Sequence, residues 1–162
     1  MEALLRAAPL RRKRLPAGTL ALAVALATAP AAGQFNKPEL AVKYRQSALF
    51  LMGSHMQRIK AELSTSKPRL EVLRASADLI DRLKTVPFEA FVPGTDEVEN
   101  TAAKPEIWTE PDRFKKLAEQ MQDRVTELDN AARAGDVAAL RSAFDETGKA
   151  CKRCHDDFRR KP

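Results

Sequence analysis

The C-terminal stretch from Asp136 to Phe158 reads DVAALRSAFDETGKACKRCHDDF. Its apolar residues, together with a glycine, two cysteines and a histidine, recur every three or four positions, which gathers them on one face of an α-helix. These positions are Val137, Leu140, Phe144, Gly148, Cys151, His155 and Phe158. Asp136 directly precedes them, and aspartate is favoured at helix N-caps. The stretch therefore predicts an amphipathic helix that carries two cysteines and a histidine.

Three earlier segments repeat this spacing, and prolines separate them. The first opens at Pro38, the second lies between Pro68 and Pro87, and the third runs from Pro111 to about Gly135. Each helix is expected to have about 18 to 25 residues, or about 27 to 37 Å. The first and last connections are short, whereas the middle one, residues 86–111, is long. Together they predict an all-α fold, an antiparallel up-down-up-down four-helix bundle.

Residues 1–33 have the pattern of a secretory signal peptide that is cleaved before Gln34, leaving residues 34–162 as the mature domain. Five basic residues precede an apolar run from Leu15 to Ala29, and small residues follow at 31–33. A membrane anchor is the alternative, but the run has about 15 residues where a spanning helix needs ~20. We therefore expect an exported protein without a stable membrane anchor.

The basic charge of the chain belongs mostly to this leader. Residues 1–33 hold five basic residues and one acidic residue, so they carry +4 of the chain's +6 and leave +2 on residues 34–162. A nucleic-acid-binding surface needs a strong positive potential. The charge therefore gives no support to a nucleic-acid partner.

The last predicted helix contains Cys151-Lys152-Arg153-Cys154-His155, a C-x-x-C-H motif typical of c-type haem attachment. Residues three and four apart share a face of a helix, so Cys151 and Cys154 can each form a thioether with one haem vinyl group. His155 lies one turn beyond Cys151, where its imidazole can bind the iron. The motif predicts one covalent haem c per chain.

Other uses of a cysteine pair fit this sequence less well. A thioredoxin-type redox pair belongs beside a βαβ pattern, and the chain shows none. A zinc site needs four ligands, whereas the sequence has two cysteines, and its other histidine is His55. A disulfide between Cys151 and Cys154 would strain the helix.

The mature segment resembles the cytochromes c′, the class II c-type cytochromes. The resemblance extends over residues 34–162, and its clearest stretches are QFNKPE (34–39), AVKYRQSAL (41–49), PGT (93–95), PEIW (105–108), AF (143–144) and CKRCHDDFR (151–159). It implies a periplasmic haem protein with His155 as the one protein ligand of the iron. It also implies that Leu49 covers the opposite face, which leaves the iron five-coordinate and high-spin.

Residues near these positions have more than one interpretation. Arg45 is one turn before Leu49 and is expected to contact a haem propionate, with a solvated helix face as the alternative. Arg159 is one turn after His155; the resemblance places it beside the His155 face of the haem, and a cation at a helix C-terminus is the alternative. Some relatives carry a methionine ligand where this chain has Leu49. Met52 is expected to fill the core and His55 to be partly buried or at an interface, rather than to bind iron.

Two functions remain open on the sequence alone. The first is a binding protein for nitric oxide and carbon monoxide that disfavours dioxygen, because an apolar pocket offers bound dioxygen no hydrogen bond. The resemblance implies that such a protein protects the cell against nitric oxide. The second is a periplasmic electron-transfer cytochrome with an unidentified redox partner. The motif has no acid–base or nucleophile cluster around it, so we do not expect an enzyme.

The resemblance also implies a homodimer that pairs the first two helices. Apolar residues beyond one core-facing stripe support this expectation, since a second apolar helix face must be buried against something. These residues are Leu51, Met56, Ile59, Leu63 and Leu79.

Overall fold

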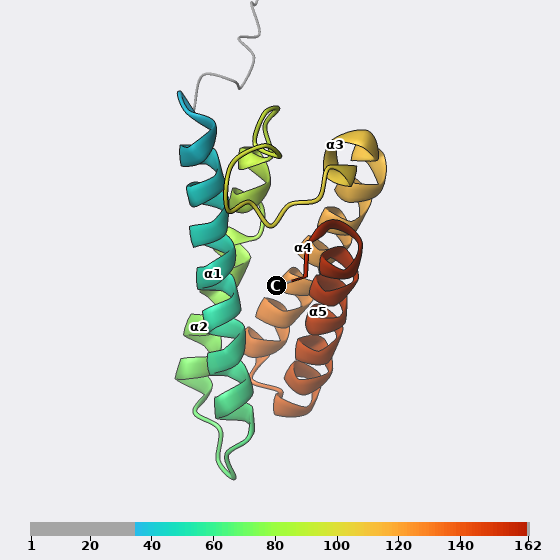
Figure 1. The fold of residues 1–162 in the computed structure, drawn as a ribbon. Helices are drawn as coiled ribbons and strands as arrows, with labels where there is room; N and C mark the ends of the chain where they lie inside the picture. Colours follow the sequence, from blue (N-terminus) through green and yellow to red (C-terminus); the bar gives the residue numbers. More distant parts are fainter. Residues whose placement is uncertain (1–34, 162) are drawn as a thin grey trace, which may run out of the picture. The chain divides into compact units, whose positions relative to one another are not determined.

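The computed structural model describes residues 35–161, and the predicted signal peptide lies outside these described residues. Its long helices are α1 (Pro38–Leu63), α2 (Leu70–Leu83), α4 (Pro111–Ala134) and α5 (Val137–Phe158). Consecutive long helices run in opposite directions, with α1 beside α2 and α4 beside α5 (Figure 1). The all-α up-down-up-down bundle predicted from the sequence is confirmed.

Helices α1, α4 and α5 begin or end at the proline, glycine and aspartate residues that marked these ends in the sequence. Proline occupies the first turn of α1 and of α4, where its missing N–H costs no hydrogen bond. Gly135 ends α4 with a left-handed φ of 76°, a conformation that side chains disfavour. The Asp136 carboxylate then accepts hydrogen bonds from the N–H groups of Ala138 and Ala139 at the start of α5.

Helix α2 has 14 residues and is shorter than the predicted 18 to 25. It begins two residues after Pro68 and ends at Leu83, before the Val86-Pro87 pair. Pro87 has no N–H to donate to the carbonyl of Leu83 four residues earlier, so the α-helical hydrogen bonds do not continue. The chain instead forms a 3-10 turn, η2 (Val86–Ala90).

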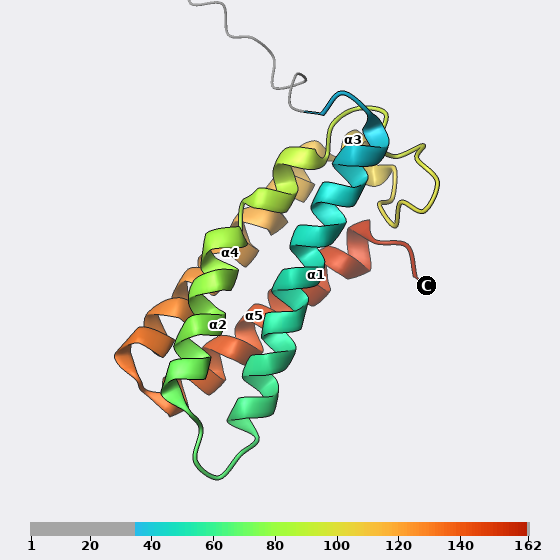
Figure 2. The ribbon, with the colours of Figure 1, turned by 90° about the vertical axis from the view of Figure 1, so that its left-hand side faces the viewer.

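The long connection between α2 and α4, residues 84–110, is called the connector below. It contains η2 and a single helical turn, α3 (Glu106–Thr109), neither of which the sequence predicted. The end of the chain holds it in place: Lys104 N–H donates to Phe158 O over 3.0 Å, and Arg160 N–H donates to Ala102 O over 2.8 Å. Figure 2 shows the connector and the C-terminal segment at the same end of the bundle.

Two apolar clusters form the interior. The main core lies among the four long helices and includes Ile59, Leu73, Leu128 and Leu140. The second cluster lies under the connector; its members are Ala103, Ile107 and Phe158, with Phe91, Trp108, Phe114, Leu117 and Cys154 packed against them. The C-x-x-C-H motif joins both clusters, because Cys151 packs against the main core and Cys154 against the second.

Part of the predicted apolar pattern is wrong in detail. Ile59 and Leu63, counted above as surplus for a dimer, are buried in the main core of the single chain. Leu51, the first of those surplus residues, is 39% exposed, and Leu40 near the start of α1 is 48% exposed. Among the described helices, none combines the length and the apolar character needed to span a bilayer.

Candidate functional site

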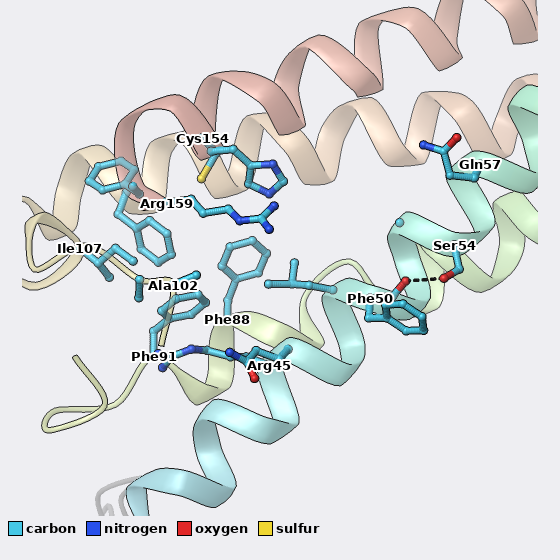
Figure 3. A pocket seen from close by; sticks show the side chains of 17 residues that line it. Arg45, Phe50, Ser54, Gln57, Phe88, Phe91, Ala102, Ile107, Cys154 and Arg159 are labelled. Atoms are coloured by element: carbon cyan, nitrogen blue, oxygen red, sulfur yellow. Dashed lines mark hydrogen bonds between the residues drawn. The ribbon is translucent and has the colours of Figure 1, made fainter. Parts of the chain in front are cut away.

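A cavity of about 680 Å³ lies between α1, the connector and the last turns of α5. Its size falls within the range of small-molecule and cofactor pockets. Figure 3 shows the side chains of α1 on one side of it and those of α5 on the other. The cavity collects Arg45, Leu49, Cys154, His155 and Arg159, all predicted from the sequence as site residues.

Helix α5 supplies one wall through Cys154, His155, Phe158 and Arg159. Cys151 lies one turn before His155 and is not among the cavity-lining residues; it is half-buried against the main core. The two cysteines are free thiols in the described residues. The structure thus places the predicted iron ligand and one predicted haem-attachment residue on the cavity wall, with the other cysteine one turn away.

Burial favours the uncharged forms of the cysteine and histidine side chains at this site. Burial raises the pKa of the Cys154 thiol to about 11 and also raises the pKa of the Cys151 thiol. Burial lowers the pKa of His155, and the nearby Arg159 guanidinium lowers it further. A lowered pKa favours the neutral imidazole, the form that has a lone pair for a metal ion.

Aromatic rings make up the floor of the cavity. The Phe114 ring packs 4.9 Å from Phe91 and 5.3 Å from Phe158, and Phe88 lies 5.8 Å from Phe114. Trp108 packs behind Phe91, with ring centroids 6.4 Å apart. The sequence placed Phe158 on the apolar face of its helix, but it did not predict that these rings meet, because they come from the connector, α4 and α5 and share no local spacing. They give the cavity a broad apolar surface.

Arg45 is buried, so its alternative interpretation as part of a solvated face is wrong. Its Nη1 donates to Ala90 O over 2.9 Å and to Thr95 Oγ1 over 2.6 Å. Its Nη2 donates to Thr95 O over 3.0 Å and to Thr101 Oγ1 over 2.8 Å. The guanidinium also lies 4.5 Å from the Phe91 ring centroid. Arg45 therefore ties α1 to the connector, and its contact with a haem propionate stays a prediction.

Helix α1 supplies the opposite wall as a strip of residues spaced as on one helix face. The cavity-lining members are Arg45, Gln46, Leu49, Phe50, Gly53, Ser54 and Gln57. The sequence pattern identified Arg45 and Leu49 as site residues but not the other five. Gly53 and Gln57 follow Leu49 in steps of four, and Phe50 and Ser54 follow Gln46 in the same steps, which was the available signal.

The two alternative iron ligands do not line this cavity. Met52 packs in the main core, as expected. His55 is half-buried, also as expected, and its Nδ1 atom is buried with no hydrogen-bond partner among the described residues.

The cavity fits a haem. Porphyrin is a flat apolar ring with two carboxylates at one edge, and the lining offers aromatic walls, two arginines and no carboxylate. His155 supplies an iron ligand, and the adjacent cysteines supply thiols for attachment. These features match the donor set that the C-x-x-C-H motif predicts.

Known proteins resemble the chain over the whole of this region. The family model for cytochrome c′ matches residues 40–159. The cytochrome c′ of Alcaligenes xylosoxydans xylosoxydans is 43% identical over 129 residues, which are 79% of this chain and 99% of the relative.

Solved structures agree in fold. A nitric oxide complex of a leucine-to-alanine variant of the Alcaligenes xylosoxidans protein superposes with a TM-score of 0.74 at 42% identity, covering 80% of this chain and 100% of the other. A carbon monoxide-bound leucine-to-glycine variant gives a TM-score of 0.73 at 42% identity, with 79% and 100% covered. The chain therefore belongs to the cytochrome c′ family, whose members bind haem c.

Proposed function

We propose that this chain is an exported c-type haem protein that binds nitric oxide and carbon monoxide on the Leu49 side of a five-coordinate, high-spin iron. The observation that carries the proposal is that His155 and Leu49 line the same cavity from opposite walls, α5 and α1. A histidine on one side and a hydrocarbon side chain on the other leave one coordination position without a protein ligand.

Covalent attachment rests on the two cysteines. Each thiol adds its sulfur and its hydrogen across one vinyl double bond, so the attachment needs no net oxidant. Cys151 and Cys154 are one helical turn apart and anchored in different apolar clusters, so two thioethers would fix the ring against α5. One motif per chain means one haem per chain.

Ligand discrimination rests on the apolar character of the Leu49 side. Leucine has no hydrogen-bond donor for bound dioxygen, whereas nitric oxide and carbon monoxide do not depend on one. The nearest cation on the same helix, Arg45, already donates its Nη hydrogens to connector oxygens. The neighbouring Ser54 hydroxyl donates to Phe50 O over 2.8 Å. Relatives solved with nitric oxide and with carbon monoxide support the same ligand class.

We place the protein in the periplasm, as a binding protein rather than an enzyme, with protection against nitric oxide as its role. The signal-peptide pattern of residues 1–33 supports export. We also propose a homodimer through α1 and α2. The exposed apolar side chains of α1, Leu40, Phe50 and Leu51, support it, because such side chains are stabilised by burial in an interface.

The purified holoprotein tests this function directly. Acid–acetone treatment should leave the colour on the polypeptide, and haem that moves into the solvent would rule out thioether attachment. Optical and EPR spectra of the ferric protein should be those of five-coordinate high-spin iron, and the ferrous protein should bind carbon monoxide and nitric oxide but not dioxygen. A low-spin six-coordinate spectrum without gas binding would contradict the proposal and favour electron transfer.

A further inference from the structure

The cavity strip of α1 has a gap in its side chains directly after Leu49. Gly53 follows Leu49 by one turn and lines the cavity, and beyond its chain neighbours and its own helix backbone no described atom lies within 4 Å of the position that a Cβ would take. Among the described glycines, those with positive φ are Gly94 and Gly135, so the backbone of Gly53 does not require glycine. Glycine is also unfavourable in a helix interior. Neither backbone conformation nor contact with the rest of the described chain explains this residue.

The gap lies beside Leu49 because of how helical side chains point. They lean towards the N-terminus, so the side chain of residue i+4 covers the turn that carries residue i. A side chain at position 53 would therefore lie over the turn of Leu49. With glycine there, no side chain from this position covers the C-terminal side of Leu49, and the neighbouring Phe50 does not cover it either, because it is 76% exposed. The other labelled cavity side chains of this part of α1, Ser54 and Gln57, are visible in Figure 3.

The N-terminal side of Leu49 is closed. Arg45 occupies it, and four hydrogen bonds to Ala90, Thr95 and Thr101 fix its guanidinium. A leucine that must move aside therefore has room in one direction along the helix and a fixed neighbour in the other.

We propose that Gly53 is a specificity-determining residue that provides the space into which the Leu49 side chain moves when a diatomic ligand binds. This inference rests on the proposed function, in which Leu49 covers the free side of the iron. In this role Gly53 determines how easily the Leu49 side chain moves. It thereby affects the rate and the affinity of gas binding. The helix accepts the less favourable glycine because a larger side chain would hold Leu49 in place.

The first test fills the space by degrees. Gly53→Ala and Gly53→Val, as holoproteins, should bind carbon monoxide progressively more slowly and more weakly. One methylene in an apolar pocket is worth ~10–200-fold, so we expect a loss of at least about tenfold for valine. Ser47→Ala is the matched control, because Ser47 is exposed on the same helix outside the cavity lining. Unchanged binding in both Gly53 variants, or an equal loss in the control, would overturn the inference.

The second test asks whether the effect passes through Leu49. In a Leu49→Ala background no bulky side chain has to move, so Gly53→Val should lose most of its effect on carbon monoxide association. Such non-additivity is the signature of two coupled residues. An equal loss in both backgrounds would mean that residue 53 only blocks an entry path, and would overturn the role assigned here.

A third measurement is independent of ligand binding to the iron. Crystals of the ferric wild-type holoprotein under xenon pressure should show a xenon atom against Gly53, and crystals of Gly53→Val should not. Wild-type protein without xenon at this position would contradict the inference. A wild type that takes xenon there but binds no carbon monoxide would contradict the proposed function instead.

Discussion

At the scale of single residues, Arg45 is unusual because it is a buried cation whose hydrogen-bond acceptors are neutral oxygens. Burial lowers its pKa to about 10, with the nearby Asp96 opposing the shift, so it is still charged at neutral pH. Its acceptors belong to the connector, which has no long helix of its own. One side chain thus fixes the segment that closes the cavity.

Arg45→Met should destabilise the protein because it leaves buried oxygens of Ala90, Thr95 and Thr101 without donors. Each buried group left unpaired costs about 1–3 kcal/mol, so we expect a clear fall in Tm and faster proteolysis of the connector. Arg82→Met is the control: Arg82 pairs with Asp78 on the exposed face of α2, where an ion pair contributes about 0–1 kcal/mol. Thermal unfolding measures both effects. Equal effects of the two substitutions would show that the hydrogen bonds of Arg45 to the connector do not stabilise the fold.

Leu49→Ala should raise carbon monoxide affinity, because the ligand no longer has to displace a side chain. We expect at least about a tenfold gain, equivalent to ~1.4 kcal/mol, at the expense of some folding stability. Leu49→Met should instead supply a thioether ligand and shift the ferric spectrum towards low spin. Equilibrium titration and EPR measure both changes, and unchanged affinity and spin state would show that Leu49 does not cover the iron.

Residues whose role depends on local spacing could be predicted from the sequence, and residues whose role depends on distant partners could not. The C-x-x-C-H motif places Cys154 and His155 three and four residues after Cys151, within one helical turn, and both line the cavity. The four hydrogen bonds of Arg45 reach oxygens 45 to 56 positions away in a segment without periodicity. The aromatic floor was missed for the same reason.

At the scale of elements, the turn between α1 and α2 is closed by a single charged pair. Arg69 donates to the Glu62 carboxylate through its backbone N–H over 2.8 Å, and through Nε and Nη2 over 3.1 and 2.8 Å. On the other side of this turn, Arg141 of α5 donates to Leu63 O. The last turn of α1 is thereby joined to both of its neighbours.

This pair predicts a pH dependence of stability. Hydrogen bonds from Arg69 lower the pKa of Glu62 from 4.5 to about 2. A carboxylate whose pKa is lower in the folded state stabilises the fold above its unfolded pKa, and this contribution is lost as the pH falls from about 4.5 to about 2. Glu62→Gln should therefore lower Tm at pH 7, with a difference from wild type that shrinks across that window. Glu97→Gln, an exposed control in the connector, should leave the Tm at pH 7 nearly unchanged in thermal scans.

Element boundaries were predictable where proline, glycine or an N-cap residue marks them, as at Pro38, Pro111 and Asp136. The short turns of the connector were not predictable, because contacts with α1 and α5 determine them rather than a periodicity of the connector itself. Hydrogen bonds to Phe158 O and from Arg160 N–H place residues 102–104, and no local pattern encodes them.

At the scale of the whole molecule, we expect the mature protein to sediment as a dimer at micromolar concentration. Leu51→Glu on α1 should shift it to monomer, since a charge in an apolar interface is unfavourable. Lys116→Glu on the exposed face of α4 is the control and should leave the mass unchanged. A monomeric wild type would contradict the proposed dimer. It would leave the proposed function of the cavity unchanged, because one chain forms the cavity.

The anchoring of the connector by the last residues also constrains how the protein is made. Synthesis proceeds from the N-terminus, so α1, α2 and the connector emerge before the segment that fixes residues 102–104. The connector can be fixed only after residues 158–160 have emerged, and the thiols of Cys151 and Cys154 emerge shortly before them. Cofactor loading and final closure therefore fall in the same late interval of maturation.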